Sequence, residues 1–380
     1  MDTVAPIRLA TYFGMLRDPR VRGRCEHRLL DIIVMALCAV IANCNDWQQI
    51  AVFAQERQDW FARFLALPNG VPSHDTFERV FDRLDPAAFQ KCFRAWVRAL
   101  TRSLDLPHIA IDGKTLRSSG SDGADLGPLH LVSAWATEAH LSLGQVAVDE
   151  KSNEITAIPQ LLALLDLKGA LVSIDAMGCQ KEIAAQIVQG GGGYLLTVKG
   201  NQGHLLEDIQ QCVEKALDTE ERPAFELHTT TEKGHGREET RLYTVIHNPA
   251  GIRDQEAWPK LHTIGMCASE RTVAGKTSSE TRYFISNEPL SAAAFAVATR
   301  DHWGIENTLH WQLDVTFRED ENRVSRRHGA ENLALLRRLA LSLLKQEGSK
   351  QSLACKRLRA ALSTRFLEKV LHAADNLGEV

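Results

Sequence analysis

The chain has 380 residues and a formal net charge of −4 at pH 7, with 44 Lys and Arg against 48 Asp and Glu. This length allows two or three domains with a sizeable core, and the composition is that of an ordinary globular protein. The overall charge therefore gives no reason to expect a nucleic-acid partner. The eight cysteines contain no CxxC pair, which excludes a cysteine zinc finger and indicates a reducing cytoplasm. The longest apolar run contains Asp31 and is short for a membrane span, so we expect no membrane partner.

Charge is unevenly distributed along the chain. From Glu321 to Lys369 there are twelve Lys or Arg against four Glu. A second basic run near the start contains Arg17, Arg20, Arg22, Arg24 and Arg28. This asymmetry suits a protein that presents two basic surfaces to a polyanion, although two solvated helix faces would give the same pattern.

Residues 1–105 are predicted to form a helical N-terminal domain for DNA binding or association. An apolar helix is expected from Leu29 to about Asn43, and the apolar residues of "DWQQIAVFAQERQDWFARFL" recur at helical spacing. Short helices separated by the turn "LPNGVPSHDT" are compatible with a helix-turn-helix, but a plain helical bundle is the simpler interpretation.

The sequence period changes to that of strands at residue 108. Five short apolar or alternating runs are bounded by turn residues: "HIAIDG", "LHLVSAWAT", "LSLGQVAVD", "GALVSIDAM" and "YLLTVKGNQ". Helical patterns precede and follow the fourth run, with Pro159 tolerable only near the start of the first helix. The order strand, strand, strand, helix, strand, helix, strand predicts an α/β fold with a ribonuclease-H-like mixed sheet, begun by residues 106–221.

The remaining segments extend this core. Residues 222–292 alternate polar and apolar side chains around Gly-rich turns and are predicted to be a β-rich insertion. Residues 293–345 are expected to complete the core with a helix. Residues 346–380 are expected to form a basic helical C-terminal tail.

The stretch "HWGIENTLHW" places His302, Glu306 and His310 four residues apart on one face of a predicted helix. His and Glu are zinc ligands, but the two histidines are about 12 Å apart along the axis, at ~1.5 Å per residue. Zn–N bonds are only about 2 Å long, so the three residues cannot bind one ion without a severe bend. A two-ligand fragment of a zinc site remains as an alternative.

Three carboxylates favour a different metal site. Asp112 and Asp175 follow strands that are neighbours in a ribonuclease-H-like sheet, and Glu306 lies on a later helix. Either aspartate alone would be read as a helix cap or an ion-pair partner. Crowded carboxylates repel one another unless cations neutralise them, and hard oxygen ligands suit Mg²⁺. Two such ions can activate a water or a 3′-hydroxyl for in-line phosphoryl transfer.

Four sequence motifs follow one another along the chain: "IAIDGKTLRSS", "SIDAMGCQKEIA", "YLLTVKGNQ" and "HWGIENTLHWQLDVTFRED". Together they resemble the DDE transposases of bacterial insertion sequences. The segment "DPRVRGRCEHRLLDIIVMALCAVIA" is similar to the extra N-terminal helical domain of the H-repeat-associated group. The resemblance covers nearly the whole chain. It implies a ribonuclease-H-like catalytic core with a β insertion before the glutamate helix, and Mg²⁺ as the cofactor, for which Mn²⁺ is expected to substitute.

The resemblance assigns Asp112, Asp175 and Glu306 as the catalytic and metal-binding residues. Related transposases often have an arginine four residues before this glutamate and a lysine seven after it, whereas this chain has His302 and Leu313. Asp314, Arg318 or Lys199 would have to replace their phosphate contacts. The residues predicted to contact DNA are Lys114, Arg117, Lys199, Asn201, His302, Trp303, Asn307 and Arg318. The basic residues could instead be solvated loop charges. Trp303 and Trp311 could stack on an unpaired base, but packing in the protein core is the favoured interpretation for both.

We therefore expect a transposase that cleaves double-stranded DNA at the element's terminal repeats and transfers the strand to target DNA by two-metal-ion phosphoryl transfer. A homodimer on DNA is implied, because both ends must be cut together. The bacterial nucleoid, in the cytoplasm, is the expected location. The alternatives are a catalytically inactive, transposase-derived DNA-binding protein and a metal-dependent DNA nuclease.

Overall fold

The computed structural model describes residues 9–373, apart from residues 22, 24, 102–105, 121–126, 149–151, 219–224, 235 and 325–326. Arg22 and Arg24 of the first basic run thus lie outside the described residues. Contacts group the chain into two compact units. Unit one consists of Met1–Asp105, Gly113–Ser152 and Glu306–Val380, and unit two of Leu106–Asp112 and Asn153–Ile305. Among the described residues, no helix combines the length and the apolar character needed to cross a bilayer.

The N-terminal region is helical, as predicted. The apolar helix expected from Leu29 is α2, and all but one of its residues are buried, as befits a helix that is apolar on every side. The helices of this region are α1 (Leu9–Phe13), α2 (Leu29–Ile41), α3 (Trp47–Glu56), α4 (Gln58–Phe61), α5 (His74–Arg83) and α6 (Pro86–Thr101).

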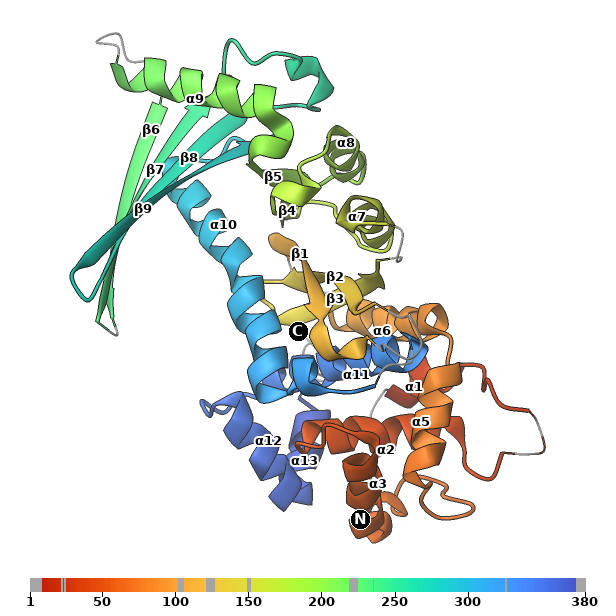
Figure 1. The fold of residues 1–380 in the computed structure, drawn as a ribbon. Coiled ribbons are helices and arrows are strands. Elements are labelled where there is room, and N and C mark those ends of the chain that lie inside the picture. Colours follow the sequence, from red (N-terminus) through yellow and green to blue (C-terminus); the bar gives the residue numbers. More distant parts are fainter. Residues whose placement is uncertain are drawn as a thin grey trace. The chain divides into compact units, whose positions relative to one another are not determined.

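The strands and helices after residue 106 occur in the predicted order (Figure 1). The strands are β1 (His108–Leu116), β2 (Leu129–Ala136), β3 (Leu141–Ala147), β4 (Leu171–Ile174) and β5 (Gly193–Val198). The helices are α7 (Glu154–Leu162), α8 (Lys181–Gln189) and α9 (Gly203–Asp218). β4 pairs in parallel with β1 and β5, whereas β2 and β3 are antiparallel. The strand order β3-β2-β1-β4-β5 within the sheet confirms the ribonuclease-H-like fold class.

Two local predictions are wrong. β1 continues for four residues beyond Asp112 instead of closing on it, because Lys114 and Leu116 are buried on one of its faces. Pro159 lies in the second half of α7 and not near its start. The missing N–H of this proline removes one intrahelical hydrogen bond, and α7 ends only three residues later.

The β-rich insertion lengthens the same sheet. It consists of β6 (Phe225–Gly234), β7 (Arg237–His247), β8 (Thr263–Val273) and β9 (Lys276–Ser286), each antiparallel to the next. β9 returns to pair antiparallel with β5, from Leu195↔Ser286 to Val198↔Tyr283. The insertion therefore ends beside the parallel strands of unit two, and the chain passes directly into α10 (Ala292–Gly304).

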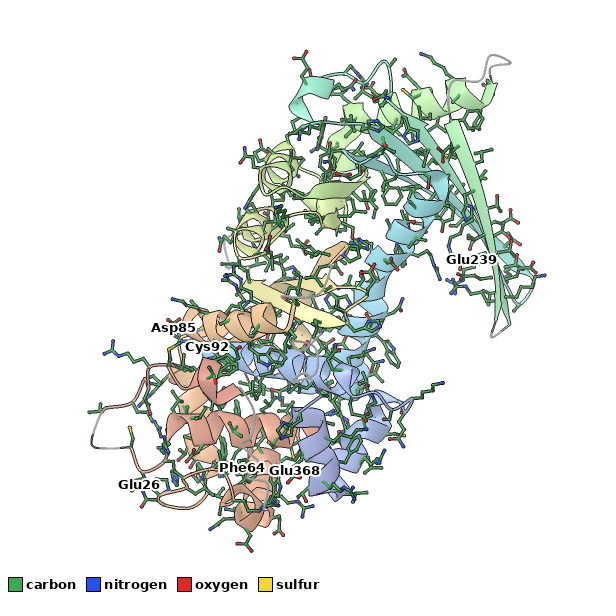
Figure 2. The ribbon with its side chains drawn as sticks, turned by 180° about the vertical axis from the view of Figure 1, so that it is seen from behind. Glu26, Phe64, Asp85, Cys92, Glu239 and Glu368 are labelled. Atoms are coloured by element: carbon green, nitrogen blue, oxygen red, sulfur yellow. The ribbon has the colours of Figure 1, made fainter. Side chains whose placement is uncertain are left out.

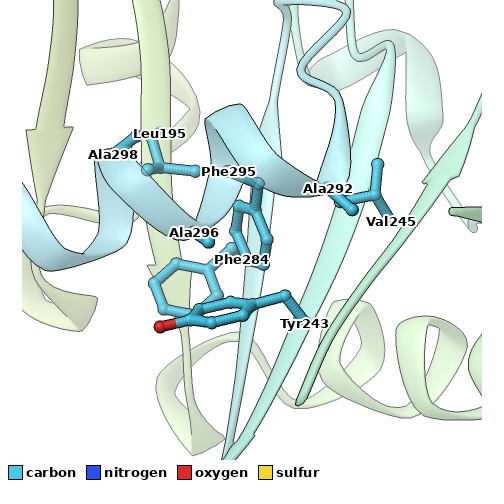
Figure 3. Close-up of a cluster of buried hydrophobic side chains, with 8 residues drawn as sticks. All are labelled: Leu195, Tyr243, Val245, Phe284, Ala292, Phe295, Ala296 and Ala298. Atoms are coloured by element: carbon cyan, nitrogen blue, oxygen red, sulfur yellow. The ribbon is translucent and has the colours of Figure 1, made fainter. Parts of the chain in front are cut away.

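An aromatic cluster fixes α10 on this extended sheet. Phe295 on α10 meets Phe284 and Tyr243 edge to face, at centroid distances of 5.2 and 5.9 Å (Figure 3). Gly265 on β8 permits this approach, because a Cβ atom there would lie 2.6 Å from the Phe295 ring. The Ser291 hydroxyl caps the helix by accepting from the N–H of Ala294. The start of α10 is thus held firmly within unit two.

The helix expected across residues 302–311 changes form after Gly304. The segments Ile305–His310 and Gln312–Thr316 are π-helical. The prediction of a regular α-helix with four-residue spacing is therefore wrong beyond Gly304. π-helical turns are rare and occur frequently at functional sites.

The C-terminal part of unit one is helical, with α11 (Arg327–Gln346), α12 (Leu353–Leu362) and α13 (Thr364–Leu371). α11 packs on α2 and α5, where Asn332 donates to the carbonyls of Phe81 and Leu84 at 2.8 and 2.9 Å. Near Phe64 and Glu368, both labelled in Figure 2, the Trp60 indole donates to Glu368 across 2.7 Å and joins α4 to α13. These contacts tie N-terminal and C-terminal helices of the chain into one unit.

Several basic residues of this region are buried rather than displayed. The Arg357 guanidinium donates to the Val40 carbonyl across 2.9 Å and stacks over the Phe317 ring at 4.1 Å. Burial lowers its pKa to about 9. Both interpretations of the basic run, as a polyanion-binding surface and as a solvated face, are wrong for four residues: Arg337, Arg338, Lys356 and Arg357.

Candidate active site

Asp112 and Asp175 lie side by side in unit two. Ile111 on β1 is paired in register with Ile174 on the parallel strand β4, and each aspartate is the next residue of its strand. Parallel neighbours lie about 4.8 Å apart, so the two carboxylates start from adjacent backbone positions. The side chain of Asp175 also caps the turn η3 (Ala176–Gly178) by accepting from the N–H of Met177 across 3.1 Å.

Electrostatics at this pair disfavour two bare negative charges. Burial raises the pKa of Asp175, and the negative charges of Asp112 and Glu154 raise it further. Hydrogen bonds from the N–H groups of Met177 and Gly178 oppose this shift only in part. A bound cation would relieve the repulsion, and two half-buried carboxylates are the hard oxygen donors that Mg²⁺ prefers. The donor set of unit two therefore fits the predicted metal.

The loop after β5 supports the backbone that follows Asp175. The Asn201 amide donates to the Ala176 carbonyl across 2.7 Å, and the Gln202 amide donates to the Cys179 carbonyl across 2.9 Å. Both bonds hold the η3 turn. Lys199, two residues before Asn201, is exposed. The amide nitrogen of Asn201 is thus engaged within the protein, while Lys199 is open to a ligand.

His302 contacts the strand that carries Asp175. Its Nδ1 lies 2.9 Å from Oγ of Ser173, and the same oxygen lies 2.7 Å from Nε2 of His108. Burial lowers the pKa of His302 to about 4 against the opposing effect of Asp112, so the ring is neutral at physiological pH. Sequence reasoning missed Ser173 and His108. The alternation of side chains along a strand could have indicated both residues, because it places Ser173 on the same face as Asp175 and His108 on the same face as Asp112.

Trp303 is not a core residue, contrary to the favoured interpretation. Its side chain is 38% exposed, and the guanidinium carbon of Arg282 lies 4.0 Å above its ring. Core packing is wrong for Trp311 as well, since that residue is 52% exposed. Arg282, on β9 of the insertion, was not among the predicted site residues, because nothing in the sequence pairs it with Trp303.

Lys114 is enclosed by carboxylates within unit one. Its Nζ lies 2.6 Å from Asp314, 3.2 Å from Asp320 and 3.3 Å from Glu319. Its side chain is only 8% exposed, whereas that of Arg117, 3.5 Å from Asp320, is 84% exposed. A phosphate contact of Lys114 would therefore compete with three internal carboxylates. Arg117 has one carboxylate nearby and an exposed side chain, so it can reach a phosphate more easily.

The remaining predicted residues lie at the start and end of the π-helical region. Glu306 and Asn307 are exposed in the first π-helical segment, and Arg318 is exposed in a left-handed backbone conformation with φ of 50°. His310 is buried. In the part of the chain that the structure describes, no group of three or more His, Cys, Asp or Glu side chains is placed to hold a metal ion by itself.

Comparisons with known proteins agree with the resemblance in the motifs. The family model "Transposase DDE domain" matches residues 103–343, and "DDE_Tnp_1-associated" matches residues 10–97. "Putative transposase YncI" of Escherichia coli O157:H7 is 40% identical over 375 residues, which are 97% of this chain and 96% of that protein. "H repeat-associated putative transposase YhhI" of Escherichia coli (strain K12) is 39% identical over 370 residues, 96% and 97% of the two chains.

A solved structure of the piggyBac transposase synaptic complex with hairpin DNA aligns over 100% of this chain and 82% of its own, at 12% identity. Its TM-score of 0.41 is too low to support an argument. The sequence matches are far stronger, because one family model spans more than half of the chain and two relatives match it almost from end to end. The chain therefore belongs to the DDE transposase family.

Proposed function

We propose that this protein is an active transposase that cleaves DNA at the ends of an insertion sequence and transfers the strand to target DNA. The observation that carries the proposal is the pairing of Ile111 with Ile174, which sets Asp112 on β1 beside Asp175 at the end of β4. Family membership supplies the chemistry for which such a pair is suited.

Asp112 and Asp175 would hold Mg²⁺, for which Mn²⁺ would substitute, and Glu306 is proposed as the third carboxylate from the motif "HWGIENTLHW". When bound, the metal ions activate a water or 3′-hydroxyl and neutralise charge on the transferring phosphate. The protein's own contribution is placement. Asp175 is fixed by its bonds to the η3 turn, and Asn201 supports that turn from the loop after β5.

Exposed residues are the first candidates for contact with DNA. Arg117, Lys199 and Arg318 would bind phosphates. Trp303, which is 38% exposed, would stack on an unpaired base, and Asn307 would hydrogen-bond nearby. Lys114, Asn201 and His302 are weaker candidates for DNA contact, because each would have to give up a bond within the protein.

The other parts of the proposal follow from the reaction. Residues 1–105 would hold terminal DNA, and a homodimer would bring both element ends together in the bacterial nucleoid. Two rival functions remain distinct from this one. An inactive DNA-binding relative would bind the ends without cutting them, and a simple nuclease would cut without joining.

One experiment separates these possibilities. The protein is incubated with Mg²⁺ and a supercoiled plasmid that carries the DNA flanking its gene on both sides. Cleaved and joined products that disappear in Glu306→Gln support the proposal. Binding without cleavage in both Mg²⁺ and Mn²⁺ favours the inactive DNA-binding protein, and cleavage that never yields joined product favours the nuclease.

A further inference from the structure

Three polar side chains form a continuous hydrogen-bonded chain inside unit two. Ser173 Oγ lies 2.7 Å from His108 Nε2 and 2.9 Å from His302 Nδ1. Ser173 is 1% exposed and His108 is 4% exposed. The two strand neighbours of Ser173, Val172 and Ile174, are buried apolar residues. A hydroxyl at such a position is costly unless it is hydrogen-bonded, so these two bonds account for its presence.

Each of the three hydrogen-bonded residues lies a few positions before one of the predicted catalytic carboxylates in the sequence. His108 lies four residues before Asp112 on β1, and Ser173 on β4 lies two residues before Asp175, which directly follows that strand in extended backbone. Even spacing in a strand places each pair on one face of the sheet. His302 is near the end of α10, four residues before Glu306.

The contact also links the three elements to one another. α10 packs on β4, and Ser173 is the β4 residue that reaches both the neighbouring strand and the helix. A hydroxyl donates one hydrogen bond and accepts others, so Ser173 can donate to a nitrogen of one ring while it accepts from an N–H of the other. The tautomers of His108 and His302 are therefore linked through Ser173, and the orientation of each ring depends on the other.

We propose that Ser173 is a positioning residue for the transposase reaction: its hydroxyl, held between two imidazoles, fixes the end of the helix that leads to Glu306 against the strands that carry Asp112 and Asp175. The inference rests on the proposed function for its effect on rate. The hydrogen-bonded chain itself can be tested in the free protein. His302 acts here through Nδ1 on Ser173.

The first test compares Ser173→Ala with Ser173→Thr on the plasmid substrate described above. Residues that orient the ligands of a metal site typically contribute 10–100-fold, so Ser173→Ala should slow single-turnover cleavage by about that factor. Affinity for the repeat DNA should stay unchanged, because the side chain is buried. Ser173→Thr keeps the hydroxyl and should retain most of the rate. Cleavage by Ser173→Ala at the wild-type rate would overturn the inference.

The second test distinguishes the two nitrogens of His302. The amide of Asn reaches the position of Nδ1, whereas that of Gln reaches the position of Nε2. His302→Asn should therefore cleave faster than His302→Gln. The opposite order would show that His302 acts through Nε2, for example on a phosphate, and would reject the positioning role.

The third test uses no DNA. In protein labelled with ¹⁵N-histidine, the ring resonances of His108 and His302 should both shift in Ser173→Ala, and those of His372 should not. Unchanged rings would reject the linked chain whatever the activity. Wild-type protein that fails to cleave, while both rings shift, would instead reject the proposed function and leave the linkage established. Asp112→Asn serves as the inactive control in the cleavage assays.

Discussion

The ammonium of Lys114 lies 2.6 Å from a carboxylate oxygen of Asp314, which joins the strand segment after Asp112 to the π-helical segment Gln312–Thr316. Glu319 lies 3.3 Å from the same ammonium and 3.2 Å from the fully buried guanidinium of Arg338. Burial would lower the pKa of Lys114, but the surrounding carboxylates raise it, so the side chain stays charged. Lys114 is therefore a structural cation in unit one.

Replacing Lys114 by Met should destabilise the protein by about 3–5 kcal/mol, because the buried carboxylates lose their counter-ion. Urea unfolding at pH 7 measures this loss. Arg117→Met is the matched control: it removes the same charge from an exposed side chain near Asp320 and should cost at most about 1 kcal/mol. Equal losses in the two variants would mean that Lys114 is not held as described.

Asp175→Asn should stabilise the metal-free protein at neutral pH while it abolishes cleavage. The raised pKa of Asp175 means that its contribution to stability is present below pH 3.8 and is lost as the pH rises through the folded-state pKa. At neutral pH the ionised carboxylate therefore destabilises the folded state, and the uncharged Asn removes this destabilisation. Thermal unfolding with EDTA should show a higher Tm for the variant, and added Mg²⁺ should raise the Tm of the wild type only. A wild-type Tm that ignores Mg²⁺ would count against a metal at this pair.

The order of the strands and the aspartate pair could be predicted from the sequence because both depend on local patterns. β4 and β5 are short apolar runs, and a carboxylate directly after a buried strand stands out. The fold then places Asp112, in the middle of β1, beside the end of β4. The return of β9 to β5 could not be predicted in this way, because alternating residues do not specify which strand they will pair with.

Charge counts misled for a related reason. They treat every Lys and Arg as exposed, whereas Arg338 is fully buried and pairs with Glu319, which lies outside its helix. The π-helical turns from Ile305 were also invisible, because their backbone bonding has no residue pattern of its own. The roles of Ser173 and His108 required the distances across β1, β4 and α10.

Glu347 should make the stability of unit one sensitive to acid. Its buried carboxylate accepts from Lys369 at 2.5 Å and lies 3.3 Å from Lys356. Burial would raise its pKa, but these partners and Ser349 lower it to about 2. The stabilisation is therefore complete above pH 4.5 and is lost as the pH falls towards 2, with a magnitude on the order of 3 kcal/mol.

Urea unfolding of the wild type and Glu347→Gln at pH 7 and pH 4 tests this expectation. The variant should be less stable at pH 7, and the gap should narrow at pH 4. Glu368→Gln, which loses a charge beside Trp60 on the same surface, provides a comparison. A gap that is constant with pH would mean that packing, not charge, explains the effect of the substitution.

The contact of Arg282 with Trp303 should contribute a measurable coupling. The guanidinium lies 4.0 Å above the ring, and Glu280 holds it from the other side through two hydrogen bonds of 2.8 and 2.7 Å. A double-mutant cycle with Arg282→Ala and Trp303→Ala should give about 0.5–1 kcal/mol, the range for a partly exposed cation–π pair. The loss of the hydrogen bonds to Glu280 cancels in the cycle, because it occurs both in Arg282→Ala and in the double variant.

The same pair links the β insertion to the helix that precedes Glu306. If Arg282 orients the Trp303 ring for stacking on a base, Arg282→Ala should weaken binding of a DNA end with unpaired terminal bases more than binding of a fully paired end. Fluorescence anisotropy with the two duplexes measures this difference. Trp303→Ala should show the same preference, and adding Arg282→Ala to that variant should change little, because Arg282 then has no ring to orient. Equal weakening on both duplexes would instead assign Arg282 to phosphate contact alone.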